Sequence, residues 1–256
     1  MDDFKNELEE SKFRFTNNIW NDLHLNLPWS LGYTTNLIEK EIFEKKEDWE
    51  NYYYKSGIRR KQILDGLPSK SRSFLEKYNA TFEEQMQVEE GNREINYAFG
   101  RTKQELMDRG KILFENIPNN NVGITEKDCF YCVYFRTICE TWNGVILREK
   151  NTIDRLSISY PYLKFEKVIR EHDYEYAIDY EVYSEHKCLF AIQIKPLSYN
   201  SGTPVIRKAR EANKRKNENY KLKYNREVLY IFSDFRGEIK NKEIVIEIEN
   251  RIKSLM

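Results

Sequence analysis

The stretch LFAIQIKPLSYNSG, residues 189–202, decides the fold prediction because it places long polar side chains inside an apolar strand. Side chains alternate across a strand, so one face is expected to be apolar and the other mixed. The apolar face consists of Phe190, Ile192 and Ile194, and the mixed face of Leu189, Ala191, Gln193 and Lys195. A buried amide without a partner costs roughly a few kcal/mol, and an ammonium costs more. We therefore expect Gln193 and Lys195 to line a cleft that holds an anion or a metal ion.

The segments around this stretch predict an α/β core with a mixed sheet. Strand-type runs rich in Tyr, Val, Ile and Phe cover 163–171, 174–183 and 187–195, and we expect an antiparallel meander. A helix is expected over 125–150, where Cys132, Phe135, Cys139, Trp142 and Ile146 follow helical spacing. A basic helix is expected over 204–225, followed by a short strand over 227–234. A strand that returns after a crossover helix usually pairs parallel, so the expected order is αβββαβ.

The first 118 residues are expected to be mainly helical. One helix is predicted to end at Gly57, and another to begin at Thr102, which has Glu105 at capping-box spacing. The segment PNNNVG, 118–123, is the clearest break in the chain. We therefore expect a helical region over 1–118 and the α/β core over 119–256.

The strand predicted over 174–183 contains an acid, Asp179, that could lie next to the mixed face of the strand predicted over 187–195. For Asp179 to lie beside Gln193, the numbers of opposed residues must sum to an even value. The hairpin around SEHK, 184–187, then needs an odd number of loop residues or a β-bulge.

An acid at the start of the second strand, followed by Gln-Ile-Lys on the third, resembles the PD-(D/E)xK nuclease superfamily in the variant where glutamine replaces the second acid. The resemblance covers about residues 125–235. It implies hydrolysis of phosphodiester bonds with Mg²⁺ as cofactor. It further implies that Asp179, the Gln193 amide oxygen and the Ile194 backbone carbonyl hold the ion, and that Lys195 orients or helps to deprotonate the attacking water.

Members of this superfamily often supply a further acid from the first core helix, and Glu140 is the candidate here. The alternative is that Glu140 forms a surface ion pair with Arg136 one helical turn before it. Glu175 and Glu181 are rival candidates because they share the predicted strand face of Asp179.

The segments WENYYYKSG and AIQIKPLSYNSG, together with the helical first half, also resemble type II restriction endonucleases of the MjaI-like group, which read CTAG. This narrower resemblance implies double-stranded DNA as partner, no nucleotide cofactor, and a homodimer whose symmetry mirrors a palindromic site. Residues 1–118 would then help to read bases and to form the dimer.

The chain keeps a basic segment next to the Gln-Ile-Lys motif. Residues 207–226 hold nine basic and two acidic side chains, nine minus two giving +7. The expected phosphate contacts from this segment are Arg207, Lys208, Lys214 and Arg215. Ser198, Tyr199 and Asn200 in the preceding loop are expected at the sugar and phosphate edge. The alternative is a solvated helix face.

A second cluster combines aromatic and basic residues as nucleic-acid surfaces do. It consists of Lys55, Arg59, Arg60 and Lys61 beside the YYY run that begins at 52. The alternative is the end of an amphipathic helix.

Composition narrows the class of protein. The 256 residues carry 42 basic and 42 acidic side chains, so a polyanion must be met by a local patch. No apolar run is long enough for a membrane span and the start lacks a secretory pattern, so we expect a soluble cytoplasmic protein.

The four cysteines are expected to be reduced. A zinc site has little support, because the first three cysteines follow helical spacing in an apolar stripe.

Two other functions stay open at this stage. One is a DNA-processing nuclease outside restriction, such as a junction resolvase, a repair nuclease or a transposon-end cleaving subunit. The other is a DNA-binding module without a working catalytic site. Both would use the same basic segment, and only cleavage of DNA separates them.

Overall fold

The computed structural model describes residues 9–26, 29, 31–75, 90–118, 123–168, 170–200, 202 and 204–255. The chain divides into two compact units, Met1–Trp142 and Asn143–Met256. The division therefore lies later in the chain than the break expected at 118. No helix in the described part of the chain is both long and apolar enough to cross a membrane.

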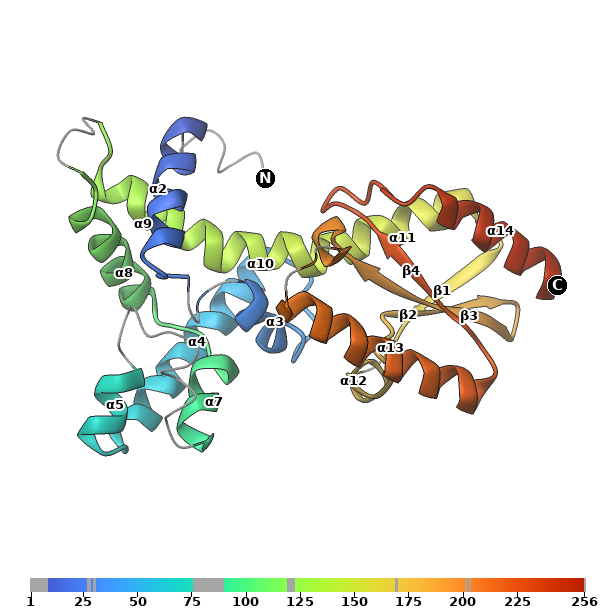
Figure 1. Cartoon of the computed structure of the whole chain (residues 1–256), viewed down its shortest axis with the longest axis horizontal. Helices are drawn as coiled ribbons and strands as arrows, with labels where there is room; N and C mark the ends of the chain where they lie inside the picture. Colours follow the sequence, from blue (N-terminus) through green and yellow to red (C-terminus); the bar gives the residue numbers. More distant parts are fainter. Residues whose placement is uncertain are drawn as a thin grey trace. The chain divides into compact units, whose positions relative to one another are not determined.

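The described secondary structure of the N-terminal unit is helical, as the sequence predicted (Figure 1). Its elements are α2 (Glu10–Asp22), α3 (Leu31–Ile38), α4 (Lys46–Asp65), α5 (Ser69–Leu75), α7 (Glu90–Ala98), α8 (Lys103–Glu115), α9 (Glu126–Tyr134), the π-helical turn η1 (Phe135–Cys139) and α10 (Glu140–Trp142).

The helix starts of this unit follow their sequence signals. The Thr102 hydroxyl accepts a hydrogen bond from the Glu105 backbone N–H at 3.2 Å, and the Glu105 carboxylate accepts one from the Thr102 N–H at 2.7 Å. The predicted capping box is thus confirmed. The predicted helix end at Gly57 is wrong, because α4 continues to Asp65. A Cβ at Gly57 would lie 2.2 Å from the carbonyl carbon of Arg101, so this glycine permits a close backbone approach.

The segment 118–123 connects two helices that pack directly on each other. A Cβ added at Gly110 of α8 would lie 2.8 Å from the Cα of Phe130 in α9. So close an approach needs glycine at the contact. The break seen in the sequence therefore falls between α8 and α9, two helices of the N-terminal unit, and its residues 119–122 lie outside the described residues.

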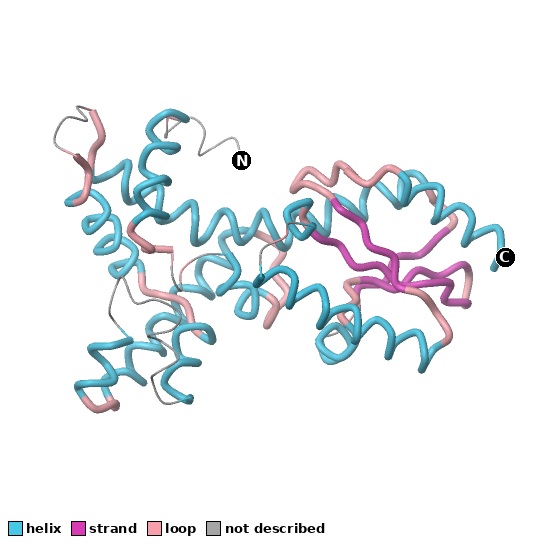
Figure 2. Tube along the Cα trace, in the orientation of Figure 1, coloured by secondary structure: helices cyan, strands magenta, loops and turns pink. Residues whose placement is uncertain are grey.

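The C-terminal unit holds one sheet with helices on both faces (Figure 2). Its elements are the π-helical turn η2 (Asn143–Leu147), α11 (Arg148–Ser159), β1 (Leu163–Lys167), α12 (Arg170–Tyr176), β2 (Tyr180–Ser184), β3 (Lys187–Lys195), the 3₁₀ turn η3 (Leu197–Asn200), α13 (Pro204–Tyr224), β4 (Val228–Phe232) and α14 (Glu243–Leu255). The strand order is β1-β2-β3-β4, with the first three antiparallel and β4 parallel to β3. This confirms the predicted mixed sheet and the αβββαβ order.

The strands expected over 163–171 and 174–183 are shorter in the structure, because α12 replaces their adjoining ends. The side chain of Tyr176 at the end of α12 packs edge-on against Tyr220 of α13, with 5.6 Å between ring centroids. Ala177 then turns the chain with a φ of 53°. The aromatic residues in this segment have a high strand propensity, because aromatic side chains usually pack well on a sheet. Here they pack on α13 instead, and this contact favours a helix.

The hairpin between β2 and β3 contains a β-bulge, one of the two arrangements that the sequence allowed. Tyr180 lies opposite Ile192, whereas beyond the bulge Tyr183 lies opposite Cys188. The residue numbers of opposed pairs sum to an even value near Asp179 and to an odd value near the hairpin tip. Leu189 is the extra residue, and its side chain joins the apolar cluster of Phe190 instead of the mixed face on which it was expected.

Two layers of helices cover the sheet. One cluster joins α11 and α14 to the apolar face of β3, and the other joins α12 and α13 to the opposite face, around Ala191. The first cluster includes Ile153, Leu156, Phe190, Ile192, Ile194, Ile244, Ile248 and Ile252. The mixed face of β3 thus points toward α13, and this orientation fixes the layer in which Gln193 lies.

Candidate active site

Asp179 lies directly before β2 and is tied to the strands on both sides of it. Its backbone N–H donates to the carbonyl of Ile192 at 2.8 Å, and its carbonyl accepts from the N–H of Val168 at 3.1 Å. Its carboxylate oxygen Oδ2 accepts from the N–H of Ile194 at 2.6 Å. The other oxygen, Oδ1, lies 4.0 Å from Nζ of Lys195. The carboxylate, 6% exposed as a residue, is therefore held at one position beside β3.

Gln193 presents a buried amide oxygen that has no hydrogen bond within the described structure. The residue is 1% exposed, and Oε1 is the unsatisfied atom. A buried carbonyl oxygen without a partner is costly and rare, so such an atom points to a ligand. Lys195 follows two residues later on the same face of β3, and its side chain is 25% exposed. The end of β3 thus combines a buried acceptor with a cation that solvent can reach.

Glu149, in the first turn of α11, brings a second carboxylate to this end of the sheet. Its Oε2 lies 2.6 Å from Nζ of Lys167, the last residue of β1. Burial raises the pKa of Glu149, and the charge of Asp179 raises it further, while Lys167 and Lys195 act in the opposite direction. Glu149 and Asp179 therefore interact within one charged cluster.

Asp173 of α12 belongs to the same cluster. Burial raises its pKa to about 7, and the neighbouring charge of Asp179 contributes to the shift. Lys195 opposes it. Three carboxylates and two ammonium groups are thus coupled here, an arrangement typical of functional sites.

The oxygen atoms at this end of the sheet suit a hard divalent cation that binds both carboxylate and amide oxygens. No three His, Cys, Asp or Glu side chains of the described residues lie close enough to hold an ion together. The site offers instead carboxylate and amide oxygens from Asp179, Gln193 and Glu149. Such a cation takes oxygen ligands, keeps several waters and needs only one or two carboxylates.

A family model described as MjaI restriction endonuclease matches residues 14–241. The chain belongs to this family. It is therefore a restriction endonuclease, a hydrolase that cleaves DNA. Neither the curated proteins nor the solved structures contain a match.

The helix acid predicted for the endonuclease, Glu140, lies in the N-terminal unit and pairs with Arg136 at 2.5 Å. This is the ion pair considered as the alternative. The rivals also have partners: Glu175 accepts from the Tyr176 hydroxyl, and Glu181 accepts from the hydroxyls of Tyr183 and Tyr220. Glu175 lies on α12, so it shares no strand face with Asp179.

Sequence reasoning missed Glu149, Asp173 and Lys167. Glu149 lies inside the predicted helix 125–150, so an acid in that helix was the available signal. The π-helical turn η2 changes the helical phase between Glu140 and Glu149. The sequence did not indicate a role for Asp173. The segment that forms α12 was predicted as the ends of two strands with Asp173 in the connection between them.

Most of the basic residues predicted to contact DNA are exposed. The exposed ones are Lys55, Arg59, Arg207, Lys208, Lys214 and Arg215, together with Ser198 and Asn200. Tyr199 is half-buried, stacks on Tyr230 and accepts a hydrogen bond from Asn213 at 2.8 Å. The Tyr199 hydroxyl therefore already has a hydrogen-bond partner within the protein.

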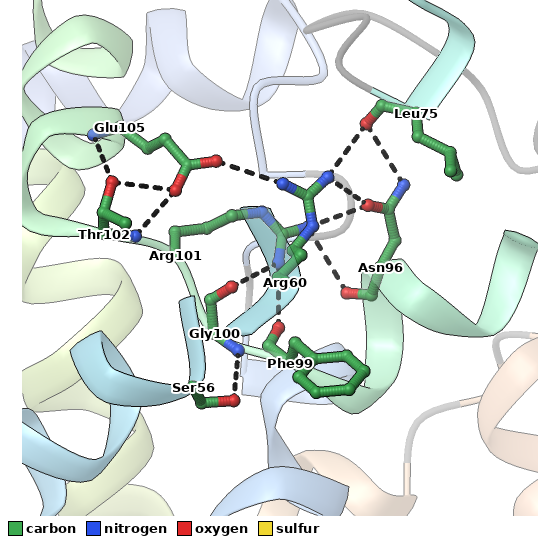
Figure 3. A network of polar contacts seen from close by, with 9 residues as sticks. All are labelled: Ser56, Arg60, Leu75, Asn96, Phe99, Gly100, Arg101, Thr102 and Glu105. Carbon is green, nitrogen blue, oxygen red and sulfur yellow. Dashed lines mark hydrogen bonds and ion pairs between the residues drawn. The ribbon is translucent and has the colours of Figure 1, made fainter. Parts of the chain in front are cut away.

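Arg60 does not lie on a DNA-binding surface. It is 2% exposed, and its guanidinium donates to Glu105 at 3.0 Å, to Asn96 at 2.7 Å and to the carbonyl of Leu75 at 3.2 Å (Figure 3). These bonds join α4 to α5, α7 and α8. The prediction for Arg60 is corrected: the side chain holds the helices of the N-terminal unit together.

The cysteines take no part in this site. All four are buried and free. Burial raises the pKa of Cys129 to about 12 and that of Cys132 to about 11. Burial therefore favours the protonated thiol at both positions.

Proposed function

We propose that the chain is a site-specific type II restriction endonuclease that hydrolyses phosphodiester bonds of double-stranded DNA with Mg²⁺ as cofactor. The observation that carries this proposal is the buried, unpaired amide oxygen of Gln193, beside the fixed carboxylate of Asp179 and on the strand that carries Lys195. An acceptor in that position gains a partner when a cation binds.

In this proposal Asp179, the Gln193 amide oxygen and the Ile194 backbone carbonyl hold the ion. Glu149 takes the role first given to Glu140, because it shares a charged cluster with Asp179, whereas Glu140 is paired with Arg136. Bound Mg²⁺ would lower the pKa of a water and neutralise charge on the phosphate.

Lys195 is the proposed catalytic residue that orients the attacking water and offsets the charge that develops on the phosphate. Its ammonium is held 4.0 Å from Asp179 and stays reachable from solvent. Gln193 adds no charge, so the site attracts a cation less strongly than a site with two strand acids would. Glu149 restores one negative charge.

DNA would lie against the exposed basic face of α13, which carries Arg207, Lys208, Lys214 and Arg215. Ser198, Tyr199 and Asn200 of η3 would approach the sugar and phosphate edge. In the N-terminal unit, Lys55 and Arg59 are exposed and would add phosphate contacts.

The family resemblance favours CTAG as the recognised sequence. A homodimer would place one active site on each strand of this palindrome, because two-fold protein symmetry mirrors the symmetry of the site. The helical N-terminal region would then help to read bases and to form the dimer.

Plasmid digestion tests the proposal. Purified protein should give discrete fragments with Mg²⁺ and none with EDTA, and Lys195→Ala should slow cleavage by about 100-fold or more. The matched control is Lys164→Ala, which removes an exposed lysine of β1 and should leave the rate unchanged. Retarded but intact DNA would identify a binding module, and a smear would favour a nuclease outside restriction.

A further inference from the structure

Asn217 is a buried amide of α13 that uses both ends of its side chain. Its Nδ2 donates to the carbonyl of Tyr176 at 2.8 Å and to the carbonyl of Ala177 at 3.1 Å. Its Oδ1 accepts from the Tyr230 hydroxyl at 2.5 Å. The residue is 9% exposed. One side chain thus joins α13 to the end of α12 and to β4.

The two carbonyls that Asn217 binds lie where the chain leaves α12 and turns toward Asp179. The last carbonyls of a helix have no partner within the helix, and both residues here are buried. Ala177 also holds a φ of 53°, which residues with a Cβ rarely adopt. Such a conformation persists where surrounding bonds hold it. Asn217 supplies those bonds two residues before Asp179.

The other arm of Asn217 reaches the strand on the far side of β3. Tyr230 of β4 lies opposite Gln193 in the parallel register. β2 and β4 flank β3, so Asn217 links β4 to the turn that leads into β2, on either side of the strand that carries Gln193. The Asn217 side chain already makes three hydrogen bonds. It therefore does not donate to the Gln193 amide oxygen, which has no partner.

We propose that Asn217 is a positioning residue for cleavage: it fixes the turn that delivers Asp179 and the strand beside Gln193, and so sets the spacing of the two proposed metal ligands. This inference rests on the proposed function. Residues that orient the ligands of a metal commonly influence metal affinity as strongly as some ligands do.

The test compares Asn217→Leu, which keeps the number of side-chain heavy atoms and the branch at Cγ and removes all three hydrogen bonds, with Asn219→Leu on the exposed face of the same helix. Calorimetric titration of Mg²⁺ into DNA-free protein should give a Kd about tenfold weaker for Asn217→Leu, and kcat for cleavage should fall by about tenfold or more. DNA affinity in EDTA should stay within about twofold, because the phosphate contacts are unchanged. Asn219→Leu should match the wild type in each measurement.

Tyr230→Phe provides the second variant, since it removes only the hydroxyl that donates to Asn217. Tyr230→Phe should also weaken Mg²⁺ binding, by a smaller factor than Asn217→Leu. If Asn217→Leu does not fold, the Mg²⁺ affinity and kcat of Tyr230→Phe test the inference. A lower Tm with unchanged Mg²⁺ affinity and kcat would overturn the inference, since it describes a purely structural residue. A wild-type protein that neither binds Mg²⁺ nor cleaves DNA would overturn the proposed function itself.

Discussion

At the scale of single residues, Glu149 is the side chain proposed to compensate for the neutral Gln193. Glu149→Gln removes this charge and keeps the shape of the side chain, so we expect cleavage to slow by about 10- to 100-fold at limiting Mg²⁺. Initial rates over a Mg²⁺ titration measure the effect. Glu140→Gln is the matched control, because it removes an acid that pairs with Arg136, and its rate should stay within about twofold. The reverse order of the two variants would return the ligand role to Glu140.

Asp173 should make the stability of the metal-free protein depend on pH. Its pKa is about 7 in the folded chain against an ordinary value of 3.8, so the folded chain keeps a proton that the unfolded chain releases between these values. Stability is therefore highest at the acid end of this window and falls as pH rises toward 7. The Tm in EDTA should decrease from pH 5 to 7, and less steeply in Asp173→Asn. Parallel profiles for the two proteins would contradict the assignment, and the exposed Asp154→Asn should follow the wild type.

At the scale of elements, the strand β3 and its motif could be predicted because their signals are local. Side-chain alternation separates Gln193 and Lys195 from Phe190 and Ile192 in any strand. The parity of the register then required either an odd number of loop residues or a bulge, and the structure has a bulge at Leu189. The parallel pairing of β4 followed from the intervening helix α13.

The elements that were missed depend on contacts outside the local sequence. The segment that became α12 is rich in tyrosine, and only packing of Tyr176 on α13 decides between strand and helix. The π-helical turns η1 and η2 break the 3.6-residue period, so a helical stripe drawn through Cys132 and Trp142 loses its phase before Glu149. The proposed site residues on β3 and at the start of β2 could therefore be predicted from the sequence, whereas Glu149 and Asp173 on the helices could not.

At the scale of the whole molecule, the charges sum to zero, so attraction to DNA must come from their distribution. The segment 207–226 carries +7, although not all of it is available. Lys221 is bound to Glu227 at 2.8 Å, and Lys223 donates to the Tyr176 hydroxyl at 2.7 Å. The exposed positions Lys214 and Arg215, nearer the start of α13, are therefore the better candidates for phosphate contacts.

The salt dependence of binding separates this local patch from a general charge effect. Each phosphate contact contributes about 0.9 to the slope of log K against log salt concentration, so Lys214→Gln with Arg215→Gln should reduce the slope by nearly 2. Lys242→Gln with Lys253→Gln removes the same charge from exposed positions at α14, which covers the opposite face of the sheet. Fluorescence anisotropy in EDTA at several salt concentrations measures both slopes. Because α13 is proposed to meet the phosphates and α14 is not, the α14 pair should keep the wild-type slope. Equal losses would show that net charge, not the α13 surface, governs binding.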